Sequence, residues 1–232
     1  MFVSRSMTRE VIMVDPDARI FDAQELMQAN DIRHLPVVDK NENLVGIVTD
    51  RDIRSALPYS YFKKALDEAE KEKIAGLRVK DIMSSKPISI SPTYTIQDAL
   101  LVIQDSKVGA LPVVDEDGKV TGIISVRDLL RAFINVLGIG EPGTLLCILV
   151  EEKIGQLKKI VDAITAEGIS FGSVLVARYW DENKRAVFIY LLTQQVAHVK
   201  KKLKDLGFTL LDPMEWYLDQ LPRNESHSEA SD

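Results

Sequence analysis

Apolar residues recur at helical spacing in two stretches of the chain, within residues 17–30 and from residue 96 onward. Residues three or four positions apart lie on one side of a helix, so both stretches predict amphipathic helices. The predicted core-facing residues are Ile20, Ala23, Leu26 and Met27 in the first helix, and Ile96, Ala99, Leu100 and Ile103 in the second.

Shorter apolar runs around each helix predict strands. A β-prone stretch precedes each helix, at residues 11–14 and 88–90. The first helix is followed by predicted strands at residues 35–38 and 44–48, and then by a helix that begins at Asp50. The same order follows the second helix, so each unit is predicted as strand, helix, strand, strand, helix.

The elements recur because the sequence itself is repeated. The run Gly46-Ile47-Val48-Thr49-Asp50-Arg51-Asp52 returns later in the chain as Gly122-Ile123-Ile124-Ser125-Val126-Arg127-Asp128. At the same offset, Leu35-Pro36-Val37-Val38-Asp39 returns as Leu111-Pro112-Val113-Val114-Asp115. A long repeat that occurs twice indicates a duplicated domain half, whereas a solenoid needs three or more shorter units.

Two further segments set the predicted domain limits. Residues 63–80 are rich in Lys, Glu and Ala and predict an exposed linking helix, with Glu68 and Glu72 at (i, i+4) spacing. Glycines and a proline at residues 138–143 predict a boundary. We therefore expect a first domain at residues 1–62, a second at 81–140, a third at 141–215 and a disordered tail at 216–232.

The third domain predicts the element order βαββαβ, which is the ferredoxin-like pattern. Its first helix, residues 156–167, is expected to end at Gly168. The residues expected to face the core from that helix are Leu157, Ile160, Val161 and Ile164. The fold class predicted for the whole chain is α+β.

Composition narrows the functional classes. The 232 residues are 46% apolar, yet the longest apolar runs fall far short of the ~20 residues that cross a bilayer, and the start lacks a secretory signal. We expect a cytoplasmic protein with no membrane partner. A net charge of −6 argues against nonspecific nucleic-acid binding. Cys147 is the one cysteine, and His34, His198 and His227 show no metal-ligand spacing, so no disulfide or metal site is expected.

Thr49-x-x-Asp52 and Ser125-x-x-Asp128 admit two interpretations. Each fits a capping box, in which the hydroxyl and the acid satisfy the first amides of a helix. Each also places a carboxylate, an arginine and free helix amides beside a glycine, where ribose hydroxyls and phosphate can bind. The residues alone leave both interpretations open.

Over residues 7–137 the sequence resembles the CBS domain pair, also called a Bateman module, through both Leu-Pro-Val-Val-Asp strands and both turns ending in Arg-Asp. The resemblance implies tandem βαββα units related by pseudo-two-fold symmetry. It also implies an adenosine ligand between them: AMP, ADP, ATP or S-adenosylmethionine. The aspartate of each turn would hold the ribose hydroxyls, and the Thr or Ser would contact phosphate or ribose.

Carried onto this chain, the resemblance implies two nucleotide-binding sites. The first comprises Thr49 and Asp52, with Arg33 and His34 facing the phosphates and Ser84 and Ile88 as the adenine wall; the second comprises Ser125 and Asp128, with Thr8 and Ile12 as the wall. Because Gly109 and Ala110 replace Arg33 and His34 in the second copy, a phosphorylated ligand is expected to prefer the first site. The alternative is that Arg33 and His34 are solvated surface residues.

The C-terminal domain resembles the ACT domain, which commonly binds amino acids at a dimer interface. Gly155 and the run Gly168-Ile169-Ser170 carry the resemblance, so Gly155 and Ser170 would contact a ligand. Alternatively, the glycines only begin and end a helix. The whole arrangement resembles the acetoin-utilisation, or AcuB-type, proteins, which implies a bacterial cytosolic regulator.

Three functional classes remain. The favoured one is a homodimeric regulatory protein in which an adenosine ligand reorients the CBS units and the ACT-like domain or a regulated enzyme partner reads the change. The alternative is a constitutive interaction scaffold. An NAD-dependent enzyme, suggested by Gly138-x-Gly140-x-x-Gly143, ranks third because that fingerprint needs a strand before it and a helix after it. No catalytic residue is expected.

Overall fold

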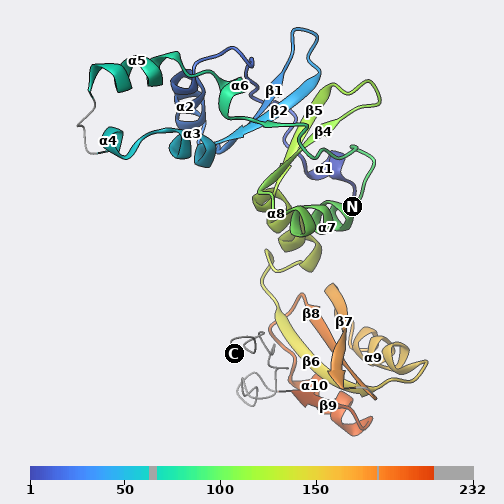
Figure 1. Cartoon of the computed structure of the whole chain (residues 1–232). Coiled ribbons are helices and arrows are strands. Elements are labelled where there is room, and N and C mark those ends of the chain that lie inside the picture. Colours follow the sequence, from blue (N-terminus) through green and yellow to red (C-terminus); the bar gives the residue numbers. More distant parts are fainter. Residues whose placement is uncertain (63–66, 182, 212–232) are drawn as a thin grey trace, which may run out of the picture. The chain divides into compact units, whose positions relative to one another are not determined.

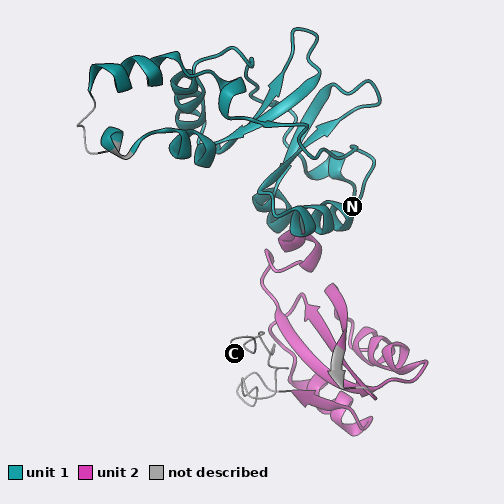
Figure 2. Ribbon diagram, in the orientation of Figure 1, with its two compact units in different colours: residues 1–132 teal, residues 133–232 magenta. Residues whose placement is uncertain are grey.

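The chain forms two compact units in the computed structural model, which describes residues 1–62, 67–181 and 183–211 (Figure 1 and Figure 2). The units are Met1–Ala132 and Phe133–Asp232, so their boundary falls within helix α8 (Val126–Leu137) and not at the predicted residues 138–143. No helix in the described part of the chain is long and apolar enough to cross a membrane. The predicted tail, residues 216–232, lies outside the described residues.

The first unit consists of two similar halves, as the repeat predicts. Each half orders its elements as helix, two antiparallel strands and helix. The first half comprises α2 (Ile20–Ala29), β1 (His34–Val38), β2 (Leu44–Thr49) and α3 (Asp50–Ala56). The second comprises α7 (Ile96–Ser106), β4 (Ala110–Val114), β5 (Val120–Ser125) and α8.

The predicted leading strands are reduced to single bridges. Val14 forms one parallel bridge with Val37, and Ile90 forms the equivalent bridge with Val113. Each bridge comes just before an Asp-Pro or Ser-Pro step, and proline has no amide hydrogen with which to continue a ladder.

In the first unit the predicted helix faces face the core with one exception. Ile20, Ala23 and Met27 are buried in the first half, and Leu26 packs against the same core. In α7 the buried residues are Ile96, Ala99 and Ile103, whereas Leu100 is 38% exposed. The prediction for Leu100 was wrong because the face of α7 that the core covers is narrower than the face that carries its apolar residues.

Each half is completed by a short helix from a distant part of the sequence (Figure 1). Helix α1 (Val3–Ser6) contacts α7 and β5, and Val3 is fully buried in the core of the second half. Helix α6 (Val79–Ile82) contacts α3 and β2, and Val79 is fully buried in the core of the first half. The predicted limits 1–62 and 81–140 therefore miss an exchange of N-terminal segments between the halves.

Methionines from the exchanged segments fill the space beside the repeated glycines. Met83 lies where a side chain on Gly46 would begin, and Met7 lies in the same place beside Gly122. The sequence predicts a close approach to these glycines, and the approaching group is a methionine.

The segment that links the halves contains α4 (Tyr59–Phe62) and α5 (Glu68–Gly76), with residues 63–66 outside the described ranges. Asp67 and Glu70 form a capping box at the start of α5. Ile74 is only 5% exposed and belongs to the core of the first half, so the helix is not wholly exposed as predicted.

The second unit has the predicted element order. It contains β6 (Thr144–Glu151), α9 (Gln156–Thr165), β7 (Phe171–Asp181), β8 (Lys184–Leu191), α10 (Ala197–Asp205) and β9 (Thr209–Leu211). The strands form one antiparallel sheet in the order β7-β8-β6-β9. Both helices pack against one core that includes Ile148, Ile160 and Leu203, so they cover the same face of the sheet. Leu157 is 40% exposed, contrary to the prediction.

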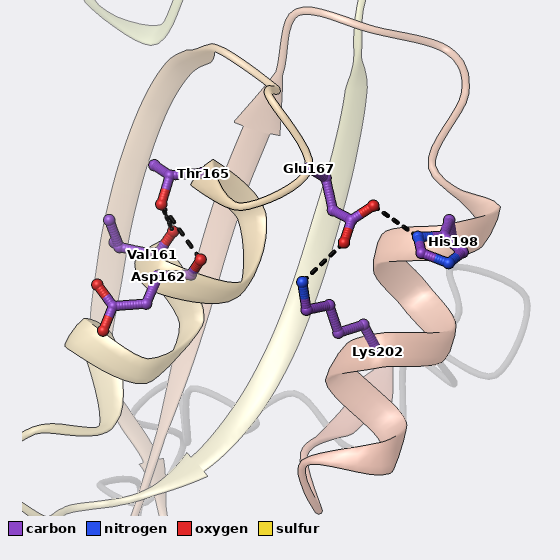
Figure 3. A network of polar contacts seen from close by, with 6 residues as sticks. All are labelled: Val161, Asp162, Thr165, Glu167, His198 and Lys202. Atoms are coloured by element: carbon purple, nitrogen blue, oxygen red, sulfur yellow. Dashed lines mark hydrogen bonds and ion pairs between the residues drawn. The ribbon is translucent and has the colours of Figure 1, made fainter.

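A polar network joins the end of α9 to α10 (Figure 3). Lys202 Nζ donates to Glu167 Oε1 at 2.7 Å, and His198 Nδ1 lies 2.6 Å from Glu167 Oε2. These partners, Lys202 above all, hold the pKa of Glu167 below its ordinary value. Helix α9 ends at Thr165, three residues before the predicted end at Gly168, and Gly168 has the left-handed φ of +69°.

Candidate functional site

A cavity of about 640 Å³ lies in the first unit and is lined by residues from both halves. The N-terminal segment supplies Thr8, Glu10, Val11 and Ile12; the end of α2 and the start of β1 supply Asp31, Ile32, Arg33 and His34; the second half supplies Gly109, Ala110, Ile123, Ser125, Val126, Arg127, Asp128, Leu130 and Arg131. The exchange of N-terminal segments creates this wall, because hydrogen bonds between the backbones of Thr8 and Ile123 hold the segment beside β5.

Asp128 both caps α8 and lines the cavity. Ser125 donates to Asp128 Oδ2 from its amide at 2.9 Å and from its hydroxyl at 2.6 Å, and the Asp128 amide lies 3.3 Å from Ser125 Oγ. All of these carboxylate contacts use one oxygen. The other oxygen, Oδ1, lies 3.8 Å from Arg131 Nη1, and the side chain is only 12% exposed. Capping therefore orients the carboxylate and leaves Oδ1 with acceptor capacity.

Thr49 and Asp52 repeat this arrangement at the start of α3. The Thr49 amide and hydroxyl donate to Asp52 Oδ2 at 2.8 and 2.7 Å, and the Asp52 amide donates to Thr49 Oγ1 at 3.2 Å. The predicted capping boxes are thus present in both halves.

Arg33 and His34 line the cavity of Ser125 and Asp128, whereas the sequence grouped them with Thr49 and Asp52. The His34 backbone does pair with Thr49 in the sheet. Its ring, however, lies against Gly109, where an added Cβ would be 2.7 Å from His34 Nε2. Because Gly109 has no side chain, the ring reaches the second half. A phosphorylated ligand was expected to prefer the first site because Arg33 and His34 were assigned to it, and their position does not support that reason.

His34 is partly buried at the cavity wall. Burial lowers the pKa of the imidazole below its ordinary value of 6.5, the charge of Arg33 lowers it further, and Asp52 opposes both effects. A neutral His34 can donate from one ring nitrogen and accept at the other.

The other predicted site residues lie in three places. Thr8 and Ile12 line the cavity together with Ser125 and Asp128, as grouped from the sequence. Ser84 belongs to β3 (Ser84–Ser85) and pairs with Ile47 on the strand that leads to Thr49, and Ile88 is 47% exposed. In the second unit, Gly155 is the N-cap of α9 with φ +91°, and the Ser170 carbonyl accepts from the Leu192 amide. Neither of them lines the cavity.

Comparison with known proteins assigns the first unit. The CBS domain family matches residues 3–59 and 79–135. A CBS domain-containing protein of Dictyostelium discoideum, DDB_G0289609, is 35% identical over 135 residues, which cover 58% of this chain and 92% of that protein. The chain belongs to the CBS domain family. The predicted CBS pair is confirmed.

Two solved structures resemble the CBS pair. CBSX2 from Arabidopsis thaliana has 32% identity and a TM-score of 0.51, over 57% of this chain and 94% of that one. A Vibrio cholerae structure described as an acetoin utilization protein (AcuB) has 30% identity and a TM-score of 0.50, over 61% and 98% respectively. Inosine-5'-monophosphate dehydrogenase of Methanocaldococcus jannaschii is 32% identical over 123 residues, but this chain spans only 22% of that enzyme.

The cavity of the CBS pair also contains charged residues that the sequence did not single out. Glu10, Asp31 and Arg131 had no assigned role, and Arg127 was noted only as the arginine of the repeated turn, where phosphate could bind. Arg127 Nη1 lies 3.8 Å from Asp31 Oδ2, so this pair joins the two halves at the cavity. The sequence could have indicated that Arg127 and Arg131 lie at the site, because Arg127 is in the repeated turn and Arg131 follows it by one helical turn.

Two other motifs carry no chemistry in the described residues. Gly138, Gly140 and Gly143 follow helix α8 and precede strand β6, which is the reverse of the context that a dinucleotide fingerprint needs. No cluster of three or more His, Cys, Asp or Glu side chains in residues 1–62, 67–181 and 183–211 is arranged to hold a metal ion.

Proposed function

We propose that this chain is a regulatory protein whose CBS pair binds an adenosine ligand in the cavity of Ser125 and Asp128. The observation that carries the proposal is the Asp128 carboxylate. Its Oδ2 is fixed by the capping box, and its Oδ1 remains at the wall of a cavity of about 640 Å³. That volume lies within the range of pockets that enclose small molecules, about 300–1,000 Å³.

The chemistry of the wall suits a nucleoside. A carboxylate oxygen accepts hydrogen bonds from hydroxyl groups, and bonds to a charged acceptor are roughly twice as strong as neutral ones. The side chains of Ile12, Ile32 and Ile123 give the cavity an apolar surface for a planar base. Arg33 makes no hydrogen bond or ion pair through its side chain with the described residues, so its guanidinium is available to a polar group on the ligand.

Because both halves line the cavity, a bound ligand would stabilise one arrangement of the two halves. Coupling of this kind is typically worth ~1–3 kcal/mol. We further propose that the second unit is an ACT-like, ferredoxin-like module, supported by its βαββαβ order and antiparallel sheet. In this proposal the protein is a cytoplasmic homodimer of the AcuB type without catalytic activity of its own, and the second unit or a partner enzyme reads the state of the CBS pair.

A constitutive scaffold is the second candidate. Both capping boxes are complete without a ligand, and Arg127 and Arg131 already have acidic partners. In that case Asp52 and Asp128 would serve only to begin α3 and α8.

Titration calorimetry of the full chain with AMP, ADP, ATP and S-adenosylmethionine separates the two candidates. A sensor releases or absorbs binding heat with at least one ligand, and a scaffold does so with none. Asp128→Asn keeps an oxygen for the cap but removes the charged acceptor, so ligand affinity at the cavity should fall about tenfold or more.

Asp98→Asn is the matched control. Thr95 and Asp98 form the same capping box at the start of α7, with contacts of 2.6 to 3.2 Å, and neither residue lines the cavity. If Asp128→Asn and Asp98→Asn bind every ligand equally, the assignment of Asp128 to ribose is wrong.

A further inference from the structure

We infer that the two halves of the CBS pair sort adenosine ligands by charge. The surface of Thr49 and Asp52 would take phosphorylated ligands, and the cavity of Ser125 and Asp128 would take ligands whose 5′ group is uncharged or positive. The inference rests on the proposed function and adds to it which class of ligand each surface binds.

The cavity is electrically balanced. Its charged residues are three acidic and three basic: Glu10, Asp31 and Asp128 against Arg33, Arg127 and Arg131. Arg127 is already near Asp31, and Arg131 is near Asp128. Glu10 is exposed and makes no hydrogen bond or ion pair with the residues that the structure describes. An incoming phosphate would therefore meet one uncommitted arginine and one uncommitted carboxylate.

The matching positions of the other half reverse two of these charges. At the offset that aligns the two repeats, Lys86 stands for Glu10 and Lys107 stands for Asp31. The other four charged cavity residues are Arg33, Arg127, Asp128 and Arg131. Their counterparts are, in the same order, Gly109, Arg51, Asp52 and Ser55. The six counterparts therefore carry three basic groups and one acidic group, a surplus of two positive charges. Three lining positions that are uncharged in the cavity, Gly109, Val126 and Leu130, have the charged counterparts Arg33, Asp50 and Arg54. Arg54 and Asp50 form an ion pair at 2.7 Å, and Arg33 itself lines the cavity, so the surplus is not reduced.

The backbone is the same at one of the two positions where the charge is inverted. Lys107 has φ 55° after α7, and Asp31 has φ 49° after α2, so both follow a helix in the left-handed conformation. Lys86 and Glu10 both lie two residues beyond equivalent bridges, because Ser84 pairs with Ile47 as Thr8 pairs with Ile123. Lys86 has φ 57° and Glu10 does not share this conformation, so these two positions match in sequence register and differ in local backbone.

Ligand charge should follow from these surfaces. A phosphomonoester such as AMP carries about −2 at neutral pH, whereas S-adenosylmethionine has a net positive charge and adenosine has none. Attraction to Lys86, Lys107 and Arg51 favours AMP at the first surface, and Glu10 and Asp31 oppose it in the cavity. All five side chains belong to exposed residues, so solvent and salt weaken the effect without changing its sign.

Calorimetry on two variants of the full chain tests the sorting. Asp52→Asn changes no residue that lines the cavity and should bind S-adenosylmethionine more tightly than AMP. Asp128→Asn leaves the first surface intact and should show the opposite order. In the Asp52→Asn background, Glu10→Lys should strengthen AMP binding about twofold to fivefold, and in the Asp128→Asn background Lys86→Glu should weaken it by a similar factor.

Charge reversals at hairpin turns are the controls. Glu116→Lys and Lys40→Glu change the net charge as Glu10→Lys and Lys86→Glu do, but neither residue lines the cavity. They should alter AMP affinity less than the paired variants, and the difference should shrink as salt is raised from about 0.05 to about 0.5 M. The same ligand order in Asp52→Asn and Asp128→Asn, or equal effects of the control reversals, would overturn the sorting and leave the proposed function standing. Absence of binding heat with every ligand in the unmodified chain would overturn both.

Discussion

The exchanged N-terminal segment makes Val3 a core residue of the half that comes later in the chain. Val3 is fully buried with Ile96 and Leu111, although the first residues of a chain usually fray. Replacing Val3 by alanine should therefore destabilise the first unit, and Val79→Ala, at the matching position of the other repeat, should do so by a similar amount.

The expected magnitude follows from the lost burial. Truncating valine to alanine removes two buried carbon groups, worth ~0.8 kcal/mol each. The cavity that remains adds about 1 kcal/mol because a packed core relaxes only in part. The free energy of unfolding should fall by about 2–3 kcal/mol, and the melting temperature of a unit of this size should fall by about 6–10 °C.

Scanning calorimetry of the full chain measures this. Val3→Ala should lower the transition of the first unit and leave the transition of the second unit unchanged. Amide hydrogen exchange should show faster opening in α7 and β5, which contact α1, than in α2 and β2.

The residue just before Val3 provides the contrast. Phe2→Ala removes a larger side chain, but Phe2 is 56% exposed and its truncation should cost much less than Val3→Ala. If Val3→Ala stays within about 0.5 kcal/mol of the unmodified chain, as is usual for surface positions, then the N-terminal segment does not complete the second core.

Three further predictions concern single side chains. Because the pKa of His34 is lowered in the folded state, the unfolded chain binds a proton more readily than the folded chain. The stability of the first unit should therefore be full above pH 6.5 and decline as the pH falls through the folded pKa. His34→Gln should reduce the difference between melting curves measured at pH 7.5 and 5.5. Gly122→Ala should destabilise the first unit by ~1–3 kcal/mol in urea titrations because its Cβ would collide with Met7, and Met7→Ala in the same chain should recover part of the loss. Burial raises the pKa of the Cys147 thiol to about 11, so at pH 8 the folded chain should react with a thiol reagent far more slowly than the chain in urea, and equal rates would contradict the burial.

Features that depend on neighbours in sequence were predictable. The capping boxes of Thr49 and Ser125 are local, and the structure contains both. The helix faces were predictable to the extent that apolar spacing reports burial. Leu100 shows the limit, since a spacing pattern does not say how wide the covering surface is.

The spacing of apolar residues could not predict which half an N-terminal segment packs against. The match of Met7 with Met83 shows that two segments are equivalent, but an equivalent segment can pack against its own half or the other. His34 illustrates the same gap at the cavity. Its neighbours in the strand pointed to Thr49, while the space that decides its ring position is provided by Gly109, which belongs to the other repeat.

Because α1 and α6 each pack against the core of the other repeat, neither CBS repeat is complete as an isolated fragment. A fragment that contains one CBS repeat alone would carry the short N-terminal helix that packs against the other repeat. It would lack the short helix that completes its own hydrophobic core. We therefore expect the duplicated pair to fold by itself and either repeat alone to fold poorly. Any rearrangement that shuffles these repeats has to move them together.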